Sequence, residues 1–283
     1  MKTKFLLLAS LFIVSVGFSQ KKWTLKECVD YALENNITIQ QNKVRIDIAA
    51  KDQEIQYGSF LPNIGFSSGS SLSSGLSPDE SGVLKNTNNL SANFNASVNG
   101  SIFNGFRLLN SYKRSKLGVE LSKLALERAQ NDISLLVVNT YLNVLFAKEN
   151  LNVAKVQAAI SKKQVDAAKQ RFEAGIIPKG DLLNTESTAA NDQQNVVIRE
   201  NTLTIALLNL AQTLQISAEG FDVEDVDVGS PLAILLYPDS NTVYEKALTI
   251  QPQIKIAELG IKDADLATDI SKAALYPSLS YTI

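Results

Sequence analysis

Apolar and polar residues alternate almost without exception between Leu90 and Phe103. A period of two predicts a β-strand with two chemically different faces. Soluble strands average about five or six residues, whereas a tilted membrane strand needs about 9–11. The length therefore favours a barrel wall over a soluble, half-buried strand. The polar face has no charges, as suits a water-filled lumen, and consists of Ser91, Asn93, Asn95, Ser97, Asn99 and Ser101.

A less regular alternation predicts an earlier strand from Asn63 to about Leu72, with Ile64, Phe66 and Leu72 on one face. Residues 73–87 between the two strands are rich in Ser, Gly, Pro and Asp and are predicted to form a surface loop. The pair is thus expected to be a hairpin with an exposed tip. A single hairpin is unstable alone, so further strands must complete the sheet.

Residues from about 106 to 174 contain no proline and a single glycine, Gly118, and are predicted to form one helix. At 1.5 Å per residue such a helix would be about 100 Å long, which indicates a coiled coil. An apolar residue recurs every seven positions, with a small residue three positions later. These rows are Val144, Leu151, Ala158, Val165 and Phe172, and Ala147, Ala154, Ser161 and Ala168.

A second apolar row on this helix indicates neighbours on two sides, as in a closed helical barrel: Phe146, Val153, Ile160 and Ala167. A return helix is predicted after a turn at residues 175–181, where Asp181 is expected to act as the N-cap. Its own sevenfold row is Leu182, Ala189, Val196, Leu203 and Leu210. The polar run 191–195 fits a tube interior and an ordinary solvated face equally well.

The pattern Thr24-Leu25-Lys26-Glu27 predicts a capping box that starts a short helix ending near Asn35 and Asn36. A second helix is predicted from about Ile37 to Gly58, before a break at Leu61-Pro62. The sequence then repeats itself at an offset of 215 positions without a gap. Aligned pairs are Ala32 with Ala247, Leu33 with Leu248, Ile39 with Ile254, Ile46 with Ile261, Ala49 with Ala264, Ile55 with Ile270, and Pro62 with Pro277.

The first residues, 1–19, are predicted to be a secretory signal peptide, with lysines before an apolar run and small residues before the cut. The alternative, a membrane anchor, needs about 20 apolar residues. Cys28 is the single cysteine, so a disulfide framework is excluded, and it is expected to pack as a small apolar residue. A strongly acidic stretch within residues 217–241 lacks the ligand spacing of a calcium loop and is expected to be a linker or short strand.

The composition argues against several function classes. The chain has no histidine, which removes the commonest general base and metal ligand. A net charge of −2 is too balanced for a nucleic-acid-binding surface. No segment after the signal is long and apolar enough for a transmembrane helix, so any membrane contact is expected to use strands. Neither a catalytic site, a cofactor nor a metal is therefore expected.

Four segments resemble the TolC family of outer-membrane efflux proteins: WTLKECVDYALENN, SFLPNIGFS, SIFNGFRLLNSYKRSKLG and RFEAGIIPKGDLLNTES. The resemblance implies a mainly α fold with β: long helical hairpins forming an α-barrel, joined to an outer-membrane β-barrel shared by a homotrimer. It also implies a passive conduit of a tripartite efflux or type I secretion system, extending from the outer membrane of a Gram-negative bacterium into the periplasm. A periplasmic adaptor would contact the tip, and an inner-membrane pump would act through it. The tip residues are Gly175, Ile176, Ile177 and Asp181.

The chain departs from some relatives at this tip, because Pro178 and Gly180 lie in the turn and the hydroxyl residue that some members carry before the acid is absent. The expected organisation is a signal peptide (1–19), periplasmic helices (20–60), a membrane hairpin (61–103), a long helical hairpin (104–216), a linker (217–241) and the truncated start of a second repeat (242–283). An adhesive coiled-coil surface protein without a conduit is the alternative. It leaves the Ser/Asn strand face and the repeat unexplained.

Overall fold

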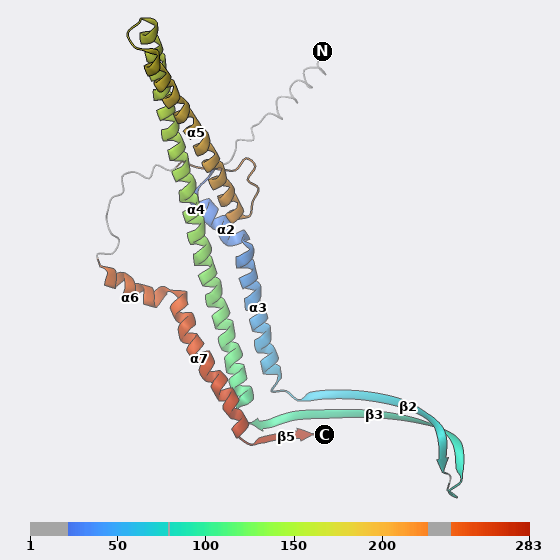
Figure 1. Ribbon diagram of the computed structural model, residues 1–283. Coiled ribbons are helices and arrows are strands. Elements are labelled where there is room, and N and C mark those ends of the chain that lie inside the picture. Colours follow the sequence, from blue (N-terminus) through green and yellow to red (C-terminus); the bar gives the residue numbers. More distant parts are fainter. Residues whose placement is uncertain (1–21, 79, 226–238) are drawn as a thin grey trace, which may run out of the picture. The chain divides into compact units, whose positions relative to one another are not determined.

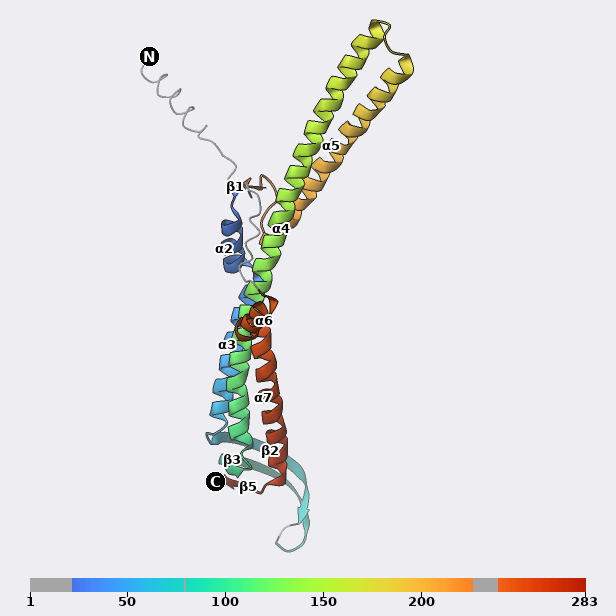
Figure 2. The ribbon, with the colours of Figure 1, turned by 90° about the vertical axis from the view of Figure 1, so that its left-hand side faces the viewer.

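The computed structural model describes residues 22–78, 80–225 and 239–283, and the chain divides into two compact units. Unit 1 comprises Met1–Gln41 and Glu127–Ser240, and unit 2 comprises Asn42–Leu126 and Asn241–Ile283. The expected signal peptide and residues 226–238 of the expected linker lie outside the described residues. Both units are built from discontinuous stretches of chain (Figures 1 and 2).

The predicted capping box is confirmed at the start of unit 1. Helix α2 spans Leu25–Asn35, and the Thr24 hydroxyl accepts a hydrogen bond from the Glu27 amide at 3.1 Å. The Glu27 carboxylate in turn accepts one from the Thr24 amide at 2.9 Å. Two amides that the helix itself leaves unpaired are thereby satisfied, which fixes where α2 begins. Helix α3 follows over Ile37–Gly58.

The long helix predicted from residue spacing is confirmed as α4, Arg107–Glu173, and α5, Lys179–Leu214, returns beside its C-terminal part (Figure 1). The predicted seam is buried at Val144, Ala147, Leu151, Ala154 and Ser161. Leu151 and Ala154 pack with Val196 of α5. The seam opens toward the turn, where Phe172 is exposed. Ser161 is accommodated in the seam because its hydroxyl donates to the carboxylate of Asp192.

Helices α2, α4 and α5 enclose the core of unit 1, and two short strands close it. Strand β1 (Lys22–Trp23) pairs in parallel with β4 (Asp222–Val223). The Tyr141 hydroxyl lies 3.2 Å from the Trp23 carbonyl oxygen and 3.1 Å from that of Glu224, within hydrogen-bond distance of both. The ring of Tyr141 is buried in the core. Its hydroxyl links the backbone of β1 to the residue that follows β4. The remaining buried core residues are Cys28, Ala32, Val137, Val144, Leu210, Ala211, Leu214, Phe221 and Val223.

Cys28 is fully buried, as expected, and burial, reinforced by Glu27, raises the pKa of its thiol to about 11. The folded state therefore favours the neutral thiol relative to the unfolded chain, where the pKa is about 8.5. This contribution to stability is complete below about pH 8.5 and is lost as the pH rises toward 11. Between pH 8 and 11 we expect the wild type to lose about 3 kcal/mol more unfolding free energy than Cys28→Ala. Denaturant unfolding across that range measures the difference, and parallel curves for the two proteins would contradict it.

Unit 2 contains a three-stranded antiparallel sheet in the order β2-β3-β5. Strand β2 spans Asn63–Pro78, β3 spans Leu84–Asn104 and β5 spans Ser278–Thr282. The prediction of a loop over residues 73–87 was wrong, because the ladder between β2 and β3 continues from Ser73 paired with Asn89 to Pro78 paired with Leu84. Backbone hydrogen bonds form a ladder whatever the side chains, so Ser, Gly and Asn extend this hairpin.

The N-terminal part of α4 lies between α3 and α7 in unit 2 (Figure 2). Its Tyr112 ring packs against Tyr57 of α3, with centroids 6.1 Å apart. On the other flank, the Arg114 guanidinium forms two hydrogen bonds to Asp263 of α7, at 2.8 and 2.9 Å. Helix α6 spans Ser240–Ile250, α7 spans Pro252–Lys272, and a 3₁₀ turn, η1, covers Ala273–Leu275.

The helices and strand near the end of the chain repeat the spacing of those near its start. Helix α6 begins 215 residues after α2, at Ser240 against Leu25. Helix α7 begins 215 residues after α3, and β5 begins 215 residues after β2. The offset found in the sequence therefore coincides with the element boundaries, so the segments form the same succession of structure.

Candidate functional site

The sheet of unit 2 has one face made entirely of polar side chains and glycine over most of its length. Residues directly opposite each other in an antiparallel pair lie on the same face. Ser97 is opposite Gly65, Asn93 is opposite Gly69, and Ser101 is opposite Ser280 of β5. The register thus places all six predicted lumen residues on one face: Ser91, Asn93, Asn95, Ser97, Asn99 and Ser101.

The opposite face of the same sheet is apolar along β3 from Leu90 to Val98, with Ser68 and Ser70 of β2 as polar exceptions, and no other described residue covers it. Phe66 and Phe94 are 73% and 76% exposed, and neither is in contact with a helix core. Water-exposed apolar side chains in such number mark a surface that another apolar phase covers. The apolar face comprises Ile64, Phe66, Leu72, Leu90, Ala92, Phe94, Ala96 and Val98.

The turn between α4 and α5 brings the predicted tip residues together at the end of the helical hairpin. Gly175 has a φ of 72°, and the Ile176 amide donates to the Arg171 carbonyl at 2.8 Å. This is the left-handed ending that glycine permits at a helix C-terminus. Ile176 and Asp181 are exposed, and Ile177 is half-buried. The expectation that Asp181 caps α5 was wrong: Pro178 is the N-cap residue, without a side-chain cap, and Asp181 lies in the first turn.

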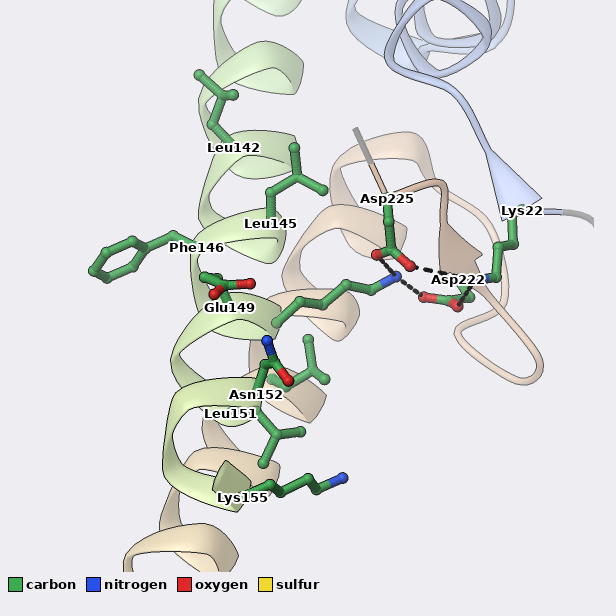
Figure 3. Close-up of a pocket in the computed structure, with 12 residues that line it drawn as sticks. Lys22, Leu142, Leu145, Phe146, Glu149, Leu151, Asn152, Lys155, Asp222 and Asp225 are labelled. Carbon is green, nitrogen blue, oxygen red and sulfur yellow. Dashed lines mark hydrogen bonds and ion pairs between the residues drawn. The ribbon is translucent and has the colours of Figure 1, made fainter. Parts of the chain in front are cut away.

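A pocket of about 940 Å³ lies beside α4 in unit 1, and a charged cluster closes one side of it (Figure 3). The Lys148 ammonium donates to the Val223 carbonyl at 2.7 Å and contacts the carboxylates of Asp222 and Asp225 at 2.8 and 3.0 Å. Lys22 lies 3.8 Å from Asp222 and 3.5 Å from Asp225. The hydrogen bond from Lys148 lowers the pKa of Asp225. The opposite wall is largely apolar, with Leu142, Leu145 and Phe146.

The Lys148 cluster fastens the β1–β4 pair to α4 and was not found from the sequence. Lys148 is only 17% exposed, so its removal leaves two acids beside a nearly buried position. We expect Lys148→Met to lower the unfolding free energy by about 1–2 kcal/mol. This is less than for a fully buried ion pair, because Asp225 remains largely solvated. Lys155→Met, which removes an exposed partner of Glu200, is expected to cost under about 0.5 kcal/mol. Denaturant unfolding compares the two variants, and a loss for Lys148→Met no larger than that for Lys155→Met would show that the cluster contributes no more than an exposed ion pair.

Within residues 22–78, 80–225 and 239–283, no group of three or more His, Cys, Asp or Glu side chains is placed to hold a metal ion. No helix in these ranges is both long enough and apolar enough to cross a membrane.

Comparison with known proteins finds that residues 28–214 match the family model described as outer membrane efflux protein. Nodulation protein T of Rhizobium leguminosarum bv. trifolii is 22% identical over 263 residues, covering 90% of this chain and 54% of its own. The crystal structure of CusC is similar with a TM-score of 0.77 at 18% identity, covering 91% of this chain and 58% of that one. The outer membrane channel CmeC of Campylobacter jejuni gives 0.72 at 20% identity, covering 91% and 55%.

This chain thus spans about half the length of the relatives that it matches. The solved structures share its mainly helical fold with a small sheet, as the sequence predicted in outline. Because the family model covers well over half of the chain and agrees with the resemblance of its four motifs, the chain belongs to the outer membrane efflux protein family of TolC-like channels.

Proposed function

We propose that the protein is a subunit of an outer-membrane channel, the passive exit conduit of a tripartite efflux system. The observation that carries this proposal is the two-faced sheet of unit 2. Its exposed apolar face suits lipid, and its opposite face of Ser, Asn and Gly suits a water-filled lumen. Leu90 to Val98 supplies about the length that a tilted strand needs to cross a bilayer. The paired residues 73–78 and 84–89 then extend the hairpin beyond this segment.

A closed barrel is needed because an open strand edge in lipid leaves backbone groups without partners. Among the described residues, β2 pairs with β3 alone, so its other edge has no partner strand there. We propose that three copies close the barrel, each contributing four strands, as the resemblance to the TolC family implies. The second apolar row on α4 supports the same assembly, since Phe146, Val153 and Ile160 remain exposed beside the buried seam.

The tip of the helical hairpin is proposed to contact a periplasmic adaptor, through Gly175, Ile176, Ile177 and Asp181. Ile176 is an exposed apolar residue at the end of a long hairpin, which is a surface that a partner can cover. Export of small molecules is the function proposed for the assembled system, with protein export by type I secretion as the other use of such a conduit.

The facing of β3 can be tested with single cysteines in a Cys28→Ala background. We expect a charged, membrane-impermeant thiol reagent to modify Ser97→Cys and to reduce single-channel conductance several-fold, because that residue is assigned to the lumen. Ala96→Cys, its neighbour on the apolar face, is the matched control and is expected to leave conductance unchanged. Modification that blocks Ala96→Cys but spares Ser97→Cys would show that the faces are reversed. Absence of any conductance from the assembled protein would refute the channel.

A further inference from the structure

The junction between the sheet and the helices of unit 2 carries a concentration of positive charge. Residues 105–119 contain Arg107, Lys113, Arg114 and Lys116 and no acidic residue. Arg114 is paired with Asp263. Within residues 22–78, 80–225 and 239–283, no acidic side chain forms an ion pair with Lys113 or Lys116, and both are exposed. Nearby Glu54 and Asp269 are already paired, with Lys51 and Lys272.

Lys113 and Lys116 lie on a face of α4 that neither flanking helix covers. Tyr112 contacts α3 and Arg114 contacts α7, and successive helical residues are about 100° apart. Lys113 therefore points to the open side between these two contacts, and Lys116 lies one turn farther on the same side. Leu109, four residues before Lys113, belongs to this face and is exposed. The face thus runs from apolar next to the sheet to basic farther along the helix.

Aromatic side chains gather at the same end of the helices. Tyr57, Phe60 and Tyr112 form a cluster with centroids 6.1 to 6.4 Å apart. The Tyr281 ring covers Gly100 on the apolar face of the sheet, where an added methyl group would lie 2.5 Å from ring atoms. Tyr and other aromatic residues concentrate where a barrel passes through the headgroup region. Lys113 and Lys116 therefore lie next to an aromatic cluster of the kind found at a membrane boundary.

We propose that this junction binds the headgroups of anionic phospholipids, with the Lys113 and Lys116 ammonium groups contacting lipid phosphates. The inference rests on the proposed function, because it requires the apolar strand face to lie in a bilayer. The lysine stems can lie along Leu109 while the charged ends reach the headgroups. A lipid rather than a free anion is the proposed ligand, since exposed apolar residues lie between the sheet and the lysines: the Phe106 ring packs against Phe103 of β3, and Leu109 follows one turn before Lys113.

Flotation of the purified full chain with vesicles tests the proposal. Vesicles of phosphatidylcholine alone are compared with vesicles containing equal parts of phosphatidylcholine and phosphatidylglycerol. Each basic side chain near an anionic surface strengthens association about fivefold. We therefore expect Lys113→Gln/Lys116→Gln to lower the preference for phosphatidylglycerol by about thirtyfold. The matched control, Lys162→Gln/Lys163→Gln, removes the same charge from exposed positions of α4 in unit 1 and is expected to keep the preference.

The outcomes separate this inference from the proposed function. Wild-type protein that associates equally with both vesicles would overturn the lipid site and leave the channel standing. Equal losses in the two double variants would also overturn it, because the effect would then be net charge alone. Loss of the preference on adding inorganic phosphate at constant ionic strength would assign the lysines to a free anion instead. Wild-type protein that associates with neither vesicle would overturn both proposals.

Discussion

Leu151→Asp is expected to destabilise the chain by about 4 kcal/mol, a large share of the 5–15 kcal/mol of a typical domain. Leu151 is buried between α4 and α5, where it packs with Ala154 and Val196. The substitution removes a buried apolar side chain and places a carboxylate in its position without a partner. The loss is measured by thermal or denaturant unfolding of the purified chain, followed by circular dichroism.

Asn152→Asp is the matched control for this substitution. It introduces the same carboxylate one residue along the helix, at an exposed position, and is expected to change stability by less than about 0.5 kcal/mol. Ser97→Asp, on the polar strand face, is also expected to be tolerated, since a lumen position remains solvated. Similar losses for Leu151→Asp and Asn152→Asp would mean that the seam between α4 and α5 is wrongly assigned.

Regular spacing made the long elements predictable. The sevenfold rows located α4 and α5 and their seam, and the period-two pattern located β3 and separated its two faces. Both patterns are local consequences of backbone geometry, with 3.6 residues per turn or two per pleat. The outer part of the hairpin was missed because Ser, Gly and Asn usually indicate loops, whereas here pairing along the backbone continues through them.

The Lys148 cluster depends on contacts that no local pattern encodes. Its acids lie on β4, and β4 is positioned by pairing with β1, where Lys22 is opposite Asp222. Two signals were present in the sequence: a lysine directly after the seam residue Ala147, and the acidic run from Asp222 to Asp225. Only the fold shows that they meet. The predicted N-cap of α5, Asp181, was also wrong. Pro178 already has the extended backbone conformation from which the helix begins, three residues before Asp181.

Phe146→Asp combined with Val153→Asp is expected to abolish assembly while leaving the chain folded. Both residues lie on the second apolar row of α4 and are 70% and 59% exposed in the single chain. Surface substitutions of this kind change chain stability by about 0.5 kcal/mol or less. In a proposed interface between copies, however, two aspartates would be buried without partners, at a cost of several kcal/mol per contact.

Native mass measurement in detergent gives the oligomeric state, and circular dichroism confirms that the variant is folded. Lys162→Asp/Lys169→Asp introduces two aspartates at exposed positions elsewhere on α4 and is expected to preserve the trimer. A trimer that survives Phe146→Asp/Val153→Asp would place the interface on another face. The apolar row would then need a different partner, because its exposed residues form one stripe along about five turns of α4 beside the buried seam. These residues are Leu142, Phe146, Val153, Val156 and Ile160.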